Sequence, residues 1–393
     1  MTSNYCLEIV FIIGLVLVCT NAEGKIFNVL SYGAKADGVT DDSKAFSNTW
    51  TDACKWNGKA TLLIPLGVYK VHATNFSGPC KEFALTFQIK GIIKAPSHPT
   101  LNCNMSWISF QYMNGLEIGG GGTLDGQGPS AWGKHHCKNL PLTLGFSFIN
   151  NAVVRDIHSI NSKHVHFKVF SCNNMTFSHV NITAPGNSPN TDGIHIALST
   201  NIHVLDSNIG TGDDCIAIIT GSKNINISGV TCGPGHGISI GSLGSSPNEV
   251  VKDIHVKNCT LIATQNGVRI KTWGSSDVGN VTHITFEDIV MKRVWNPMII
   301  DQHYCPNHNC SSQESSVQIK NVTFKNIRGT SSSRAAVTLY CSASFPCKEI
   351  ILNDINLVYH GPHEPAIASC THAKGKATGK ELPPSCLTKS LNS

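Results

Sequence analysis

Short alternations of apolar and polar residues recur along most of this chain. Each has apolar residues two apart with a polar residue between them, as in Asn174–His179, Asn201–Asp206 and Asp253–Val256. This pattern is typical of β-strands, whose successive side chains point to opposite faces. The equivalent apolar positions lie about 23 to 38 residues apart: Val154, Phe177, Val204, Ile227, Val256, Phe286, Phe324 and Leu352. A period of that length holds several short strands and turns but no helix, which indicates a solenoid.

We therefore predict an all-β fold, a single-stranded right-handed parallel β-helix. Alternate apolar side chains would stack inside it, and the asparagines that precede many strands would form a ladder at the turns. A β-sandwich is the main alternative, but it does not explain so regular a repeat over so much of the chain. Leucine-rich repeats are disfavoured because their leucine pattern is absent.

One segment near the N-terminus is typical of a helix. Asp41–Ser43 is a candidate N-cap, and the helix formers that follow continue to Trp50 and Ala53. Such a helix would cover the first open edge of a solenoid. At the other end, residues 373–393 are rich in Lys, Gly, Pro and Ser, which predicts an irregular tail to a domain spanning residues 23–393.

Residues 1–22 are interpreted as a secretory signal peptide. Ile9–Val18 is an apolar run, and Thr20–Ala22 offers small residues at the cleavage positions, although Glu8 and the lack of Lys and Arg are atypical. A membrane anchor is the alternative, but the apolar run is too short to span a bilayer. We therefore expect a secreted, extracellular protein without membrane association.

Composition narrows the choice of partner. The formal net charge is +5 and the sequence pI about 8.4, a weak indication of an anionic partner. No Lys/Arg-rich run with interleaved aromatic residues is present, which argues against nucleic acid. These features leave an anionic partner other than nucleic acid as the expectation.

Cysteine usage agrees with an oxidising compartment. Of the 16 cysteines, Cys6 and Cys19 would leave with the signal, and the remaining even number suits disulfides. Close pairs indicate local bridges: Cys215/Cys232, Cys305/Cys310, Cys341/Cys347 and Cys370/Cys386. A zinc site is the alternative, but the spacing lacks the repeated Cys-x-x-Cys of structural zinc sites. Glycosylation sequons recur, and those inside strand-like runs are at least as well explained by a structural asparagine.

Four polar clusters fall at the same relative place in successive repeats. They are Asn190–Asp192, Gly212–Cys215, Gly235–Gly237 and Arg269–Lys271. If the repeats stack, neighbouring rungs lie about 4.8 Å apart, so Asp192, Asp213/Asp214 and His236 would share one face. Arg269 and Lys271 are two apart on a strand and would point to the same side. An acid cluster beside a pair of cations is therefore predicted.

This constellation suits cleavage of a glycosidic bond. Close carboxylates raise the pKa of one member, so one acid can donate a proton while an ionised neighbour activates water. The cations would hold an anionic sugar. Taken alone, each cluster has a structural interpretation: a turn residue at Asp192, a calcium pair or solvated turn at Asp213/Asp214, a backbone contact at His236, and ordinary solvated charges at Arg269 and Lys271. A calcium site is not excluded by these residues.

Together the clusters resemble the signature of the polygalacturonases, glycoside hydrolase family 28, in kind, order and approximate spacing. Ile300–Tyr304, Tyr32–Ser43 and Gly122–Gly128 also resemble segments of this family, so the likeness covers nearly all of the mature chain. After Cys215–Ile218, similar plant sequences usually have Gly-Asp or Gly-Ser, where this chain has Ile219 and Thr220. That departure concerns the local turn more than activity.

The resemblance implies a right-handed parallel β-helix that hydrolyses α-1,4 links in galacturonan, with inversion and without a metal or other cofactor. It assigns Asp213 as the proton donor, Asp192 and Asp214 to water activation, and His236 to tuning of the donor or contact with substrate. The remaining assignments are substrate binding by Arg269, Lys271, Asn190 and Tyr304, and a bracing disulfide between Cys215 and Cys232.

The segments Gly235–Gly244 and Asn266–Trp273 are most similar to plant exopolygalacturonases, including those of pollen, which favours exo over endo action. A protonated donor beside ionised acids further predicts an acidic pH optimum. Two alternatives share the architecture. A pectate lyase would need calcium and an arginine base, and a wall-binding protein would bind galacturonan without cleaving it.

Overall fold

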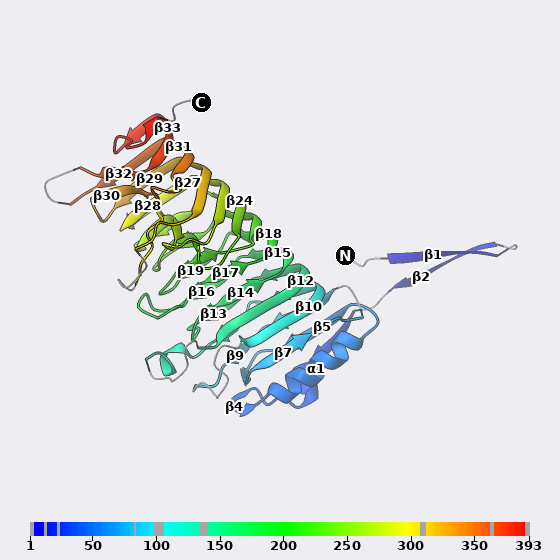
Figure 1. Ribbon diagram of the computed structural model, residues 1–393. Coiled ribbons are helices and arrows are strands. Elements are labelled where there is room, and N and C mark those ends of the chain that lie inside the picture. Colours follow the sequence, from blue (N-terminus) through cyan, green and yellow to red (C-terminus); the bar gives the residue numbers. More distant parts are fainter. Residues whose placement is uncertain are drawn as a thin grey trace.

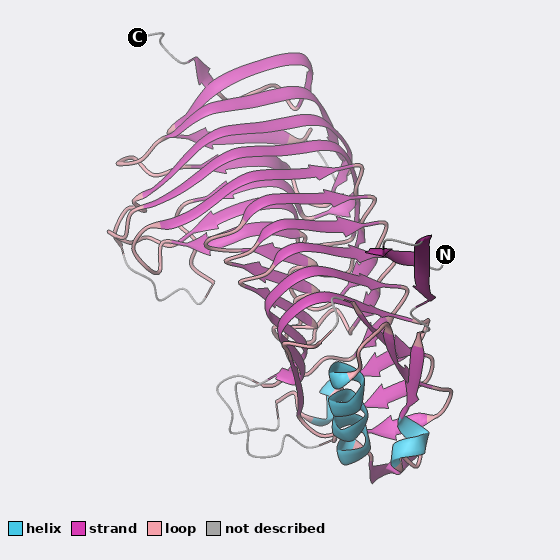
Figure 2. Ribbon diagram, turned by 90° about the vertical axis from the view of Figure 1, so that its right-hand side faces the viewer, coloured by secondary structure: helices cyan, strands magenta, loops and turns pink. Residues whose placement is uncertain are grey.

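The computed structural model describes residues 4–11, 14–21, 24–81, 84–97, 106–133, 140–306, 312–361 and 365–389. From Lys25 onward the strands join one continuous sheet whose pairings are all parallel, and the chain winds through it in coils (Figures 1 and 2). The predicted right-handed parallel β-helix is confirmed, and the parallel pairing excludes a β-sandwich.

Each coil contributes to three columns of stacked strands. The first column contains β7 (Thr74–Ser77), β14 (Phe167–Phe170), β17 (Ile194–Ala197), β20 (Ile216–Ile218), β23 (Ile238–Leu243), β26 (Asn266–Thr272), β28 (Asn296–Asp301), β30 (Ala335–Tyr340) and β32 (Ile367–Thr371). The second contains β3 (Lys25–Asn28), β5 (Ala60–Ile64), β8 (Leu85–Ile89), β15 (Asn173–Ser178), β18 (Thr200–Leu205), β21 (Lys223–Ser228), β24 (Glu249–Lys257), β33 (Ala373–Leu382) and β34 (Thr388–Lys389).

The third column contains β4 (Asp37–Asp41), β6 (Val68–Lys70), β9 (Ile92–Lys94), β11 (Thr123–Asp125), β13 (His158–Ile160), β16 (Asn181–Thr183), β19 (Asn208–Gly210), β22 (Thr231–Cys232) and β25 (Thr260–Ile262). Five longer strands bend from one column into the next: β10 (Ser106–Gly119), β12 (Leu142–Arg155), β27 (Gly279–Val294), β29 (Val317–Ser331) and β31 (Cys347–Tyr359). These bends hold consecutive columns at an angle around one core.

The repeated apolar positions of the sequence stack in the second column. Val154 is in register with Phe177, and the same ladder continues, one residue per rung, to Leu352. All eight side chains are at most 1% exposed. The sequence period therefore reports the coil length, because each period returns the chain to the same place in the core.

The asparagine ladder is also present. The Asn174 side chain donates to Asn151 over 2.6 Å, Asn201 donates to Asn173 over 2.9 Å, and Asn224 donates to Asn201 over 2.5 Å. Asn151, Asn174, Asn201 and Asn224 all have φ between 54° and 57°, a left-handed conformation that asparagine tolerates better than most residues. Asn174 belongs to a sequon, and the ladder gives it a structural role.

The predicted N-terminal helix is α1 (Ser43–Lys55), the one α-helix in the part of the chain that the structure describes. Its apolar face packs on the first coils, where the Trp50 ring lies 5.0 Å from that of Phe76 and 5.6 Å from that of Phe110. It covers the N-terminal end of the solenoid as expected (Figures 1 and 2). Two short 3-10 helices, η1 (Val29–Tyr32) and η2 (Gly128–Ser130), form turns.

Both terminal segments contain strands that the sequence analysis did not predict. The interpretation of residues 373–393 as an irregular tail is wrong for Ala373–Leu382, which forms β33 and pairs with β31. The exposed edge of the last full coil offers unpaired backbone groups, and these accept a further strand despite its Lys- and Gly-rich sequence. At the other end, β1 (Asn4–Phe11) and β2 (Gly14–Asn21) form a separate antiparallel hairpin (Figure 1). The signal peptide over residues 1–22 stays a prediction.

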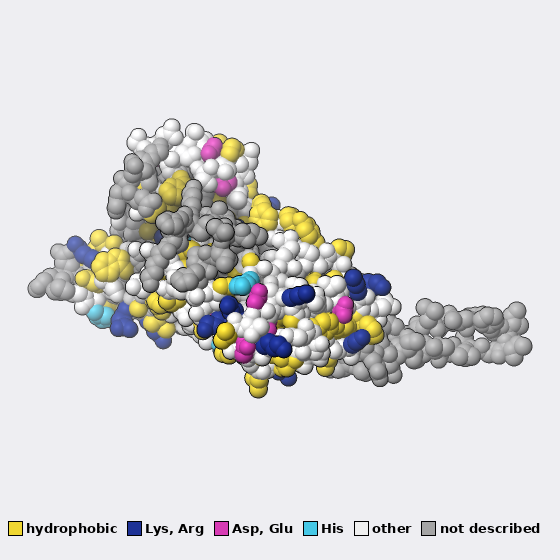
Figure 3. All heavy atoms as spheres, turned by 90° about the horizontal axis from the view of Figure 1, so that it is seen from below, with side chains coloured by type: hydrophobic (Ala, Val, Ile, Leu, Met, Phe, Trp, Pro, Cys, Tyr) yellow, Lys and Arg dark blue, Asp and Glu magenta, His cyan; other side chains and the backbone are white. Residues whose placement is uncertain are grey.

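Within the described helices, none is long and apolar enough to cross a membrane. On the face seen in Figure 3, basic and acidic side chains are interspersed.

Candidate active site

The four polar clusters meet on the first column. Asp192 precedes β17, Asp213 and Asp214 precede β20, His236 precedes β23, and the cations lie within β26. These strands are consecutive rungs, because Ile194 is in register with Ile216, Ile216 with Ile238, and Ile238 with Val268. The prediction of neighbouring rungs is confirmed.

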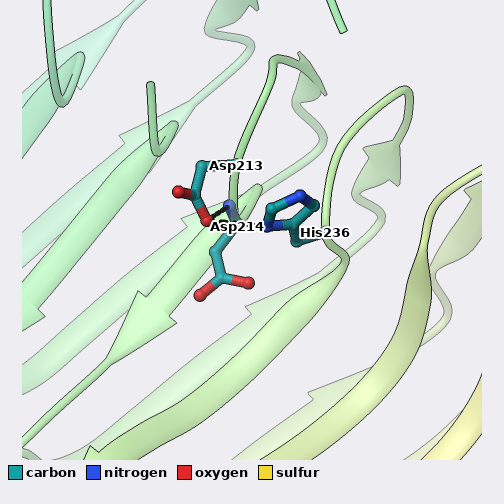
Figure 4. A group of neighbouring side chains, drawn as sticks. All are labelled: Asp213, Asp214 and His236. Carbon is teal, nitrogen blue, oxygen red and sulfur yellow. Dashed lines mark hydrogen bonds and ion pairs between the residues drawn. The ribbon is translucent and has the colours of Figure 1, made fainter. Parts of the chain in front are cut away.

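Asp213 and His236 form a hydrogen-bonded pair. His236 Nδ1 lies 2.9 Å from Asp213 Oδ1, and the His236 amide donates to the Asp213 carbonyl over 2.8 Å (Figure 4). Asp213 is 24% and His236 36% exposed, so a ligand on this surface can reach both side chains. Burial alone would raise the pKa of Asp213, but the hydrogen bond and charge of His236, with the charge of Lys271, hold it below its usual value.

Asp214 points the other way (Figure 4) and is buried in a nest of donors. Its Oδ1 accepts from Ser239 Oγ over 2.7 Å and from Arg269 Nη2 over 2.8 Å, and its Oδ2 accepts from Lys271 Nζ over 2.8 Å. Arg269 Nε also donates to Ser239 Oγ over 3.0 Å. Both Asp214 oxygens therefore act as acceptors, and the predicted pair of cations is assembled around this carboxylate.

Asp192 completes the acid trio in a different environment. Its side chain is 15% exposed, and His195 Nδ1 lies 3.9 Å from its Oδ2. Burial, followed by the charges of Asp213 and Asp214, holds the pKa of Asp192 well above its usual value despite the opposing charge of Lys271. Asp192 therefore holds its proton to higher pH than Asp213, whose pKa is lowered.

Tyr304 lies beside the cations, whereas Asn190 lies in an exposed turn at the edge of the site. The Tyr304 ring centroid is 5.1 Å from Lys271 Nζ and 5.8 Å from Arg269 Cζ, and Trp273 packs 4.9 Å away. Asn190 is exposed in the turn before Asp192, with a φ of 52°. Within the described residues the Asn190 side chain has no hydrogen bond to the acids.

A family model described as "Glycosyl hydrolases family 28" matches residues 54–379. The chain belongs to this family. Among similar proteins, an exopolygalacturonase of Platanus acerifolia is 46% identical and covers 92% of this chain and 98% of its own length. A polygalacturonase of Gossypium hirsutum is 43% identical, with 95% and 93% covered. An exopolygalacturonase of Zea mays is 45% identical, with 91% and 90% covered.

Solved structures show the same fold at lower identity. An endo-xylogalacturonan hydrolase from Aspergillus tubingensis has a TM-score of 0.77 at 22% identity and covers 90% of this chain and all 100% of its own. A hyperthermoactive exopolygalacturonase from Thermotoga maritima has a TM-score of 0.70 at 20% identity, with 85% and 88% covered. As a family 28 member, the chain is a glycosidase.

Disulfides brace the site and the C-terminal coils. Cys215–Cys232 forms as the resemblance implied and ties the residue after Asp214 to the next rung. Cys341–Cys347 and Cys370–Cys386 confirm two further local pairs, while Cys310 of the Cys305/Cys310 pair lies outside the described residues. Cys54–Cys80, 26 residues apart, was too distant in sequence to predict. Cys172 and Cys259 are free and buried.

One group of possible metal ligands is present in the described residues. Asp213, Asp214 and His236 offer ligand atoms within 4.8 Å of one another. However, Arg269 and Lys271 already contact the Asp214 oxygens, and His236 already contacts Asp213. A divalent cation would have to compete with two fixed positive charges, so the donor set fits calcium poorly.

Two contributors escaped the sequence reasoning. Ser239 bridges Asp214 and Arg269, and His195 lies beside Asp192. The ladder through Lys168, His195, Ala217, Ser239 and Arg269 places all of these on the outer face of the first column. Strand alternation away from the motifs could have found them. Burial, with the charge of Lys168, lowers the pKa of His195 to about 4, so its imidazole is neutral at ordinary pH.

Proposed function

We propose that this protein hydrolyses the α-1,4 links of galacturonan in de-esterified pectin with inversion. The observation that carries this proposal is the acid trio stacked on consecutive rungs beside Arg269, Lys271 and Tyr304. Relatives named polygalacturonase and exopolygalacturonase support the same substrate. Acids alone would suit many glycans, whereas the adjoining cations favour a sugar that carries a carboxylate.

Asp213 is the proposed proton donor. Its pKa is held low in the protein without substrate, so it needs a source for the proton it gives to the leaving oxygen. His236 supplies one, because its Nδ1 lies 2.9 Å from Asp213 Oδ1 and a single proton can lie between them. The pair as a whole, rather than Asp213 alone, is therefore the acid.

Asp192 and Asp214 are proposed to orient and activate the water. Asp214 is held by its three donors, whereas Asp192 must first lose the proton that its raised pKa retains. Activity should rise as Asp192 ionises and fall as the Asp213–His236 pair loses its proton. A bell-shaped pH profile follows, and a rate that keeps rising above neutral pH would contradict these roles.

Arg269 and Lys271 retain donors for a uronate. Arg269 uses Nε and Nη2 on Ser239 and Asp214, and Lys271 uses one hydrogen bond. In the described residues Arg269 Nη1 has no hydrogen-bond partner, which leaves it and the remaining Lys271 protons for a substrate carboxylate. Tyr304 would flank the bound sugar, and Asn190 would contact it from the edge of the site.

We further propose exo action that releases galacturonate, by a secreted monomer in the plant cell wall. The exopolygalacturonase names of relatives at 45% and 46% identity support the exo mode. The predicted signal peptide and the disulfides support secretion.

A time course on polygalacturonate tests this proposal, with products sized by chromatography and ultraviolet absorbance recorded. Galacturonate monomer from the earliest points, without absorbance, is expected. A spread of oligomers would mean endo action, rising absorbance lost on chelation would mean a lyase, and binding without products would mean a wall-binding protein. Asp213→Asn should lower turnover about 10²- to 10⁴-fold with an unchanged circular dichroism spectrum; near-wild-type activity would refute the donor assignment.

A further inference from the structure

A second concave site adjoins the acid trio. It is a cavity of about 580 Å³ lined by residues of successive turns that precede first-column strands, including His236, Thr264, Arg293, Trp295 and Ser332. This volume lies in the range of small-molecule sites. His236 belongs to both places, because its Nδ1 contacts Asp213 while its side chain also lines the cavity. The cavity thus adjoins the candidate active site through His236.

The cavity runs along the solenoid axis, on the side where the chain enters the first-column strands. His236 precedes β23, Thr264 precedes β26 and Trp295 precedes β28, which are consecutive rungs. Trp295 therefore lies two rungs, roughly 10 Å, beyond His236, and one rung beyond Arg269 and Lys271. A polymer that lies along the axis from His236 would pass Thr264 and then reach Arg293 and Trp295.

Trp295 is an exposed ring on a fixed backbone. Its side chain is 56% exposed, although its amide donates to the Thr264 carbonyl over 3.0 Å and its carbonyl accepts from Ser333 Oγ over 2.6 Å. These backbone hydrogen bonds fix the position from which a large apolar side chain is presented to solvent. Such a face suits the C–H side of a sugar ring, which is apolar while its hydroxyls are polar.

Arg293 supplies an unneutralised positive charge. Its amide donates to Thr330 Oγ1 over 2.8 Å, but its guanidinium has no ion pair or hydrogen bond to any described residue. In contrast, Arg269 and Lys271 both contact Asp214. Arg293 is therefore free to bind a carboxylate at no loss of an existing ion pair.

Thr264 adds an independent sign of an absent partner. It is 2% exposed, and its Oγ1 is buried with no hydrogen-bond partner among the described residues. Buried hydroxyls are nearly always hydrogen-bonded in folded proteins.

We propose that this cavity is a further subsite for a uronate unit of the polysaccharide, with Trp295 stacking on the sugar ring and Arg293 binding its carboxylate. The proposal rests on the function proposed above and extends it, because it predicts that affinity depends on chain length. Galacturonan oligomers long enough to reach two rungs past His236 gain these contacts, and the dimer does not.

Steady-state kinetics on galacturonan oligomers of two to eight units test this subsite. Arg293→Gln and Trp295→Ala should each raise KM for the longest oligomers about tenfold, leave kcat within twofold, and leave KM for the dimer unchanged. The Arg293→Gln effect should shrink with added salt, whereas that of Trp295→Ala should not. Arg328→Gln removes an exposed arginine of β29 outside the cavity and controls for general charge; it should match the wild type.

Calorimetric titration of oligomers into Asp213→Asn, with and without Arg293→Gln, gives a readout that needs no turnover. The subsite is supported if the double variant binds the octamer more weakly than Asp213→Asn does but binds the dimer equally well. The subsite is refuted if wild-type enzyme cleaves galacturonan while both cavity variants keep the wild-type KM at every oligomer length. It is also refuted if the variants lose the same factor of affinity for the dimer and for the octamer. If Trp295→Ala fails to fold, Arg293→Gln alone decides. A wild type without activity on galacturonan would refute the proposed function instead.

Discussion

The second column and the first column are built from the same coils but are filled by opposite chemistry. The second column stacks Val154 to Leu352 in register, all at most 1% exposed, with asparagines hydrogen-bonded at its bends. On the outer face of the first column, buried Asp214, Arg269 and Lys271 stand close together, and Asp192 keeps its proton to higher pH than an ordinary aspartate. The apolar ladder of the second column stabilises the folded state. The buried charges of the first column carry a desolvation cost that folding alone would not favour.

The contrast teaches that a regular core can support an irregular site. Each rung of the second column fixes the start of the next coil, so turns before the first column can hold acids, glycines and a histidine without setting the fold. Substitutions in the second column should therefore change stability, and substitutions on the first should change activity.

The largest loss of stability is expected from Phe286→Ala in the second column. Phe286 is 0% exposed and packs 5.2 Å from Phe324, so truncation should lower the free energy of unfolding by about 3 to 5 kcal/mol. Denaturant titration measures this, and turnover at 25 °C should stay near wild type. Phe148→Ala is the control, because Phe148 is 44% exposed. Equal losses for the two variants would show that the buried ladder is not what stabilises the coils.

Asp192→Asn should raise stability at neutral pH and lower activity. Because the folded-state pKa of Asp192 is raised, the folded protein binds more protons than the unfolded chain above the ordinary aspartate value, and stability falls as pH rises through that window. The neutral amide removes this penalty. Melting temperature should therefore rise at pH 7 and change little at acidic pH, while turnover falls about 10²- to 10⁴-fold.

Asp37→Asn is the control of opposite sign. Hydrogen bonds from Thr40 and Val39 lower the pKa of Asp37 to about 2, so its stabilising effect is present at neutral pH and disappears as pH falls through that value. Its substitution should lower the melting temperature at pH 7. A lower melting temperature for Asp192→Asn at pH 7 would contradict the charge distribution described for the acid trio.

His166→Gln should flatten the loss of stability on acidification. His166 is 0% exposed, burial lowers its pKa to about 3, and its Nδ1 lies 2.8 Å from Ser159 Oγ. The unfolded chain binds a proton near pH 6.5 that the folded protein refuses, so wild-type stability should fall by about 2 kcal/mol between pH 6.5 and 5 from this residue. Unfolding titrations at several pH values measure the slope. A wild-type slope in His166→Gln would refute the assignment.

The repeated apolar positions of the core could be predicted from the sequence. The side-chain contacts between coils of unequal length could not. The period of Val154 to Leu352 sufficed for the second column, and strand alternation put Arg269 and Lys271 on one side. That both would contact Asp214, with Ser239 between, depends on register across coils of unequal length. Likewise, composition argued for an irregular C-terminus, but pairing with β31 made residues 373–382 a strand.

The smallest effect tests the bend between the two columns. Asn201 has a φ of 57°, donates to Asn173 over 2.9 Å and accepts from Asn224 over 2.5 Å. Asn201→Gly removes the amide but tolerates the left-handed backbone, and should lower the free energy of unfolding by about 1 kcal/mol. Asn201→Ala loses the same hydrogen bonds and adds about 1 kcal/mol of left-handed strain.

The difference in stability between the two variants therefore measures the left-handed backbone strain. The loss of stability in the glycine variant measures the contribution of the asparagine hydrogen bonds. Since Asn201 lies after the bend that follows β17, while the acids precede β17 and β20, turnover should remain at the wild-type level in both. A fall in turnover without a fall in stability would mean that the ladder sets the spacing of the catalytic rungs, and that the two columns are less independent than their chemistry suggests.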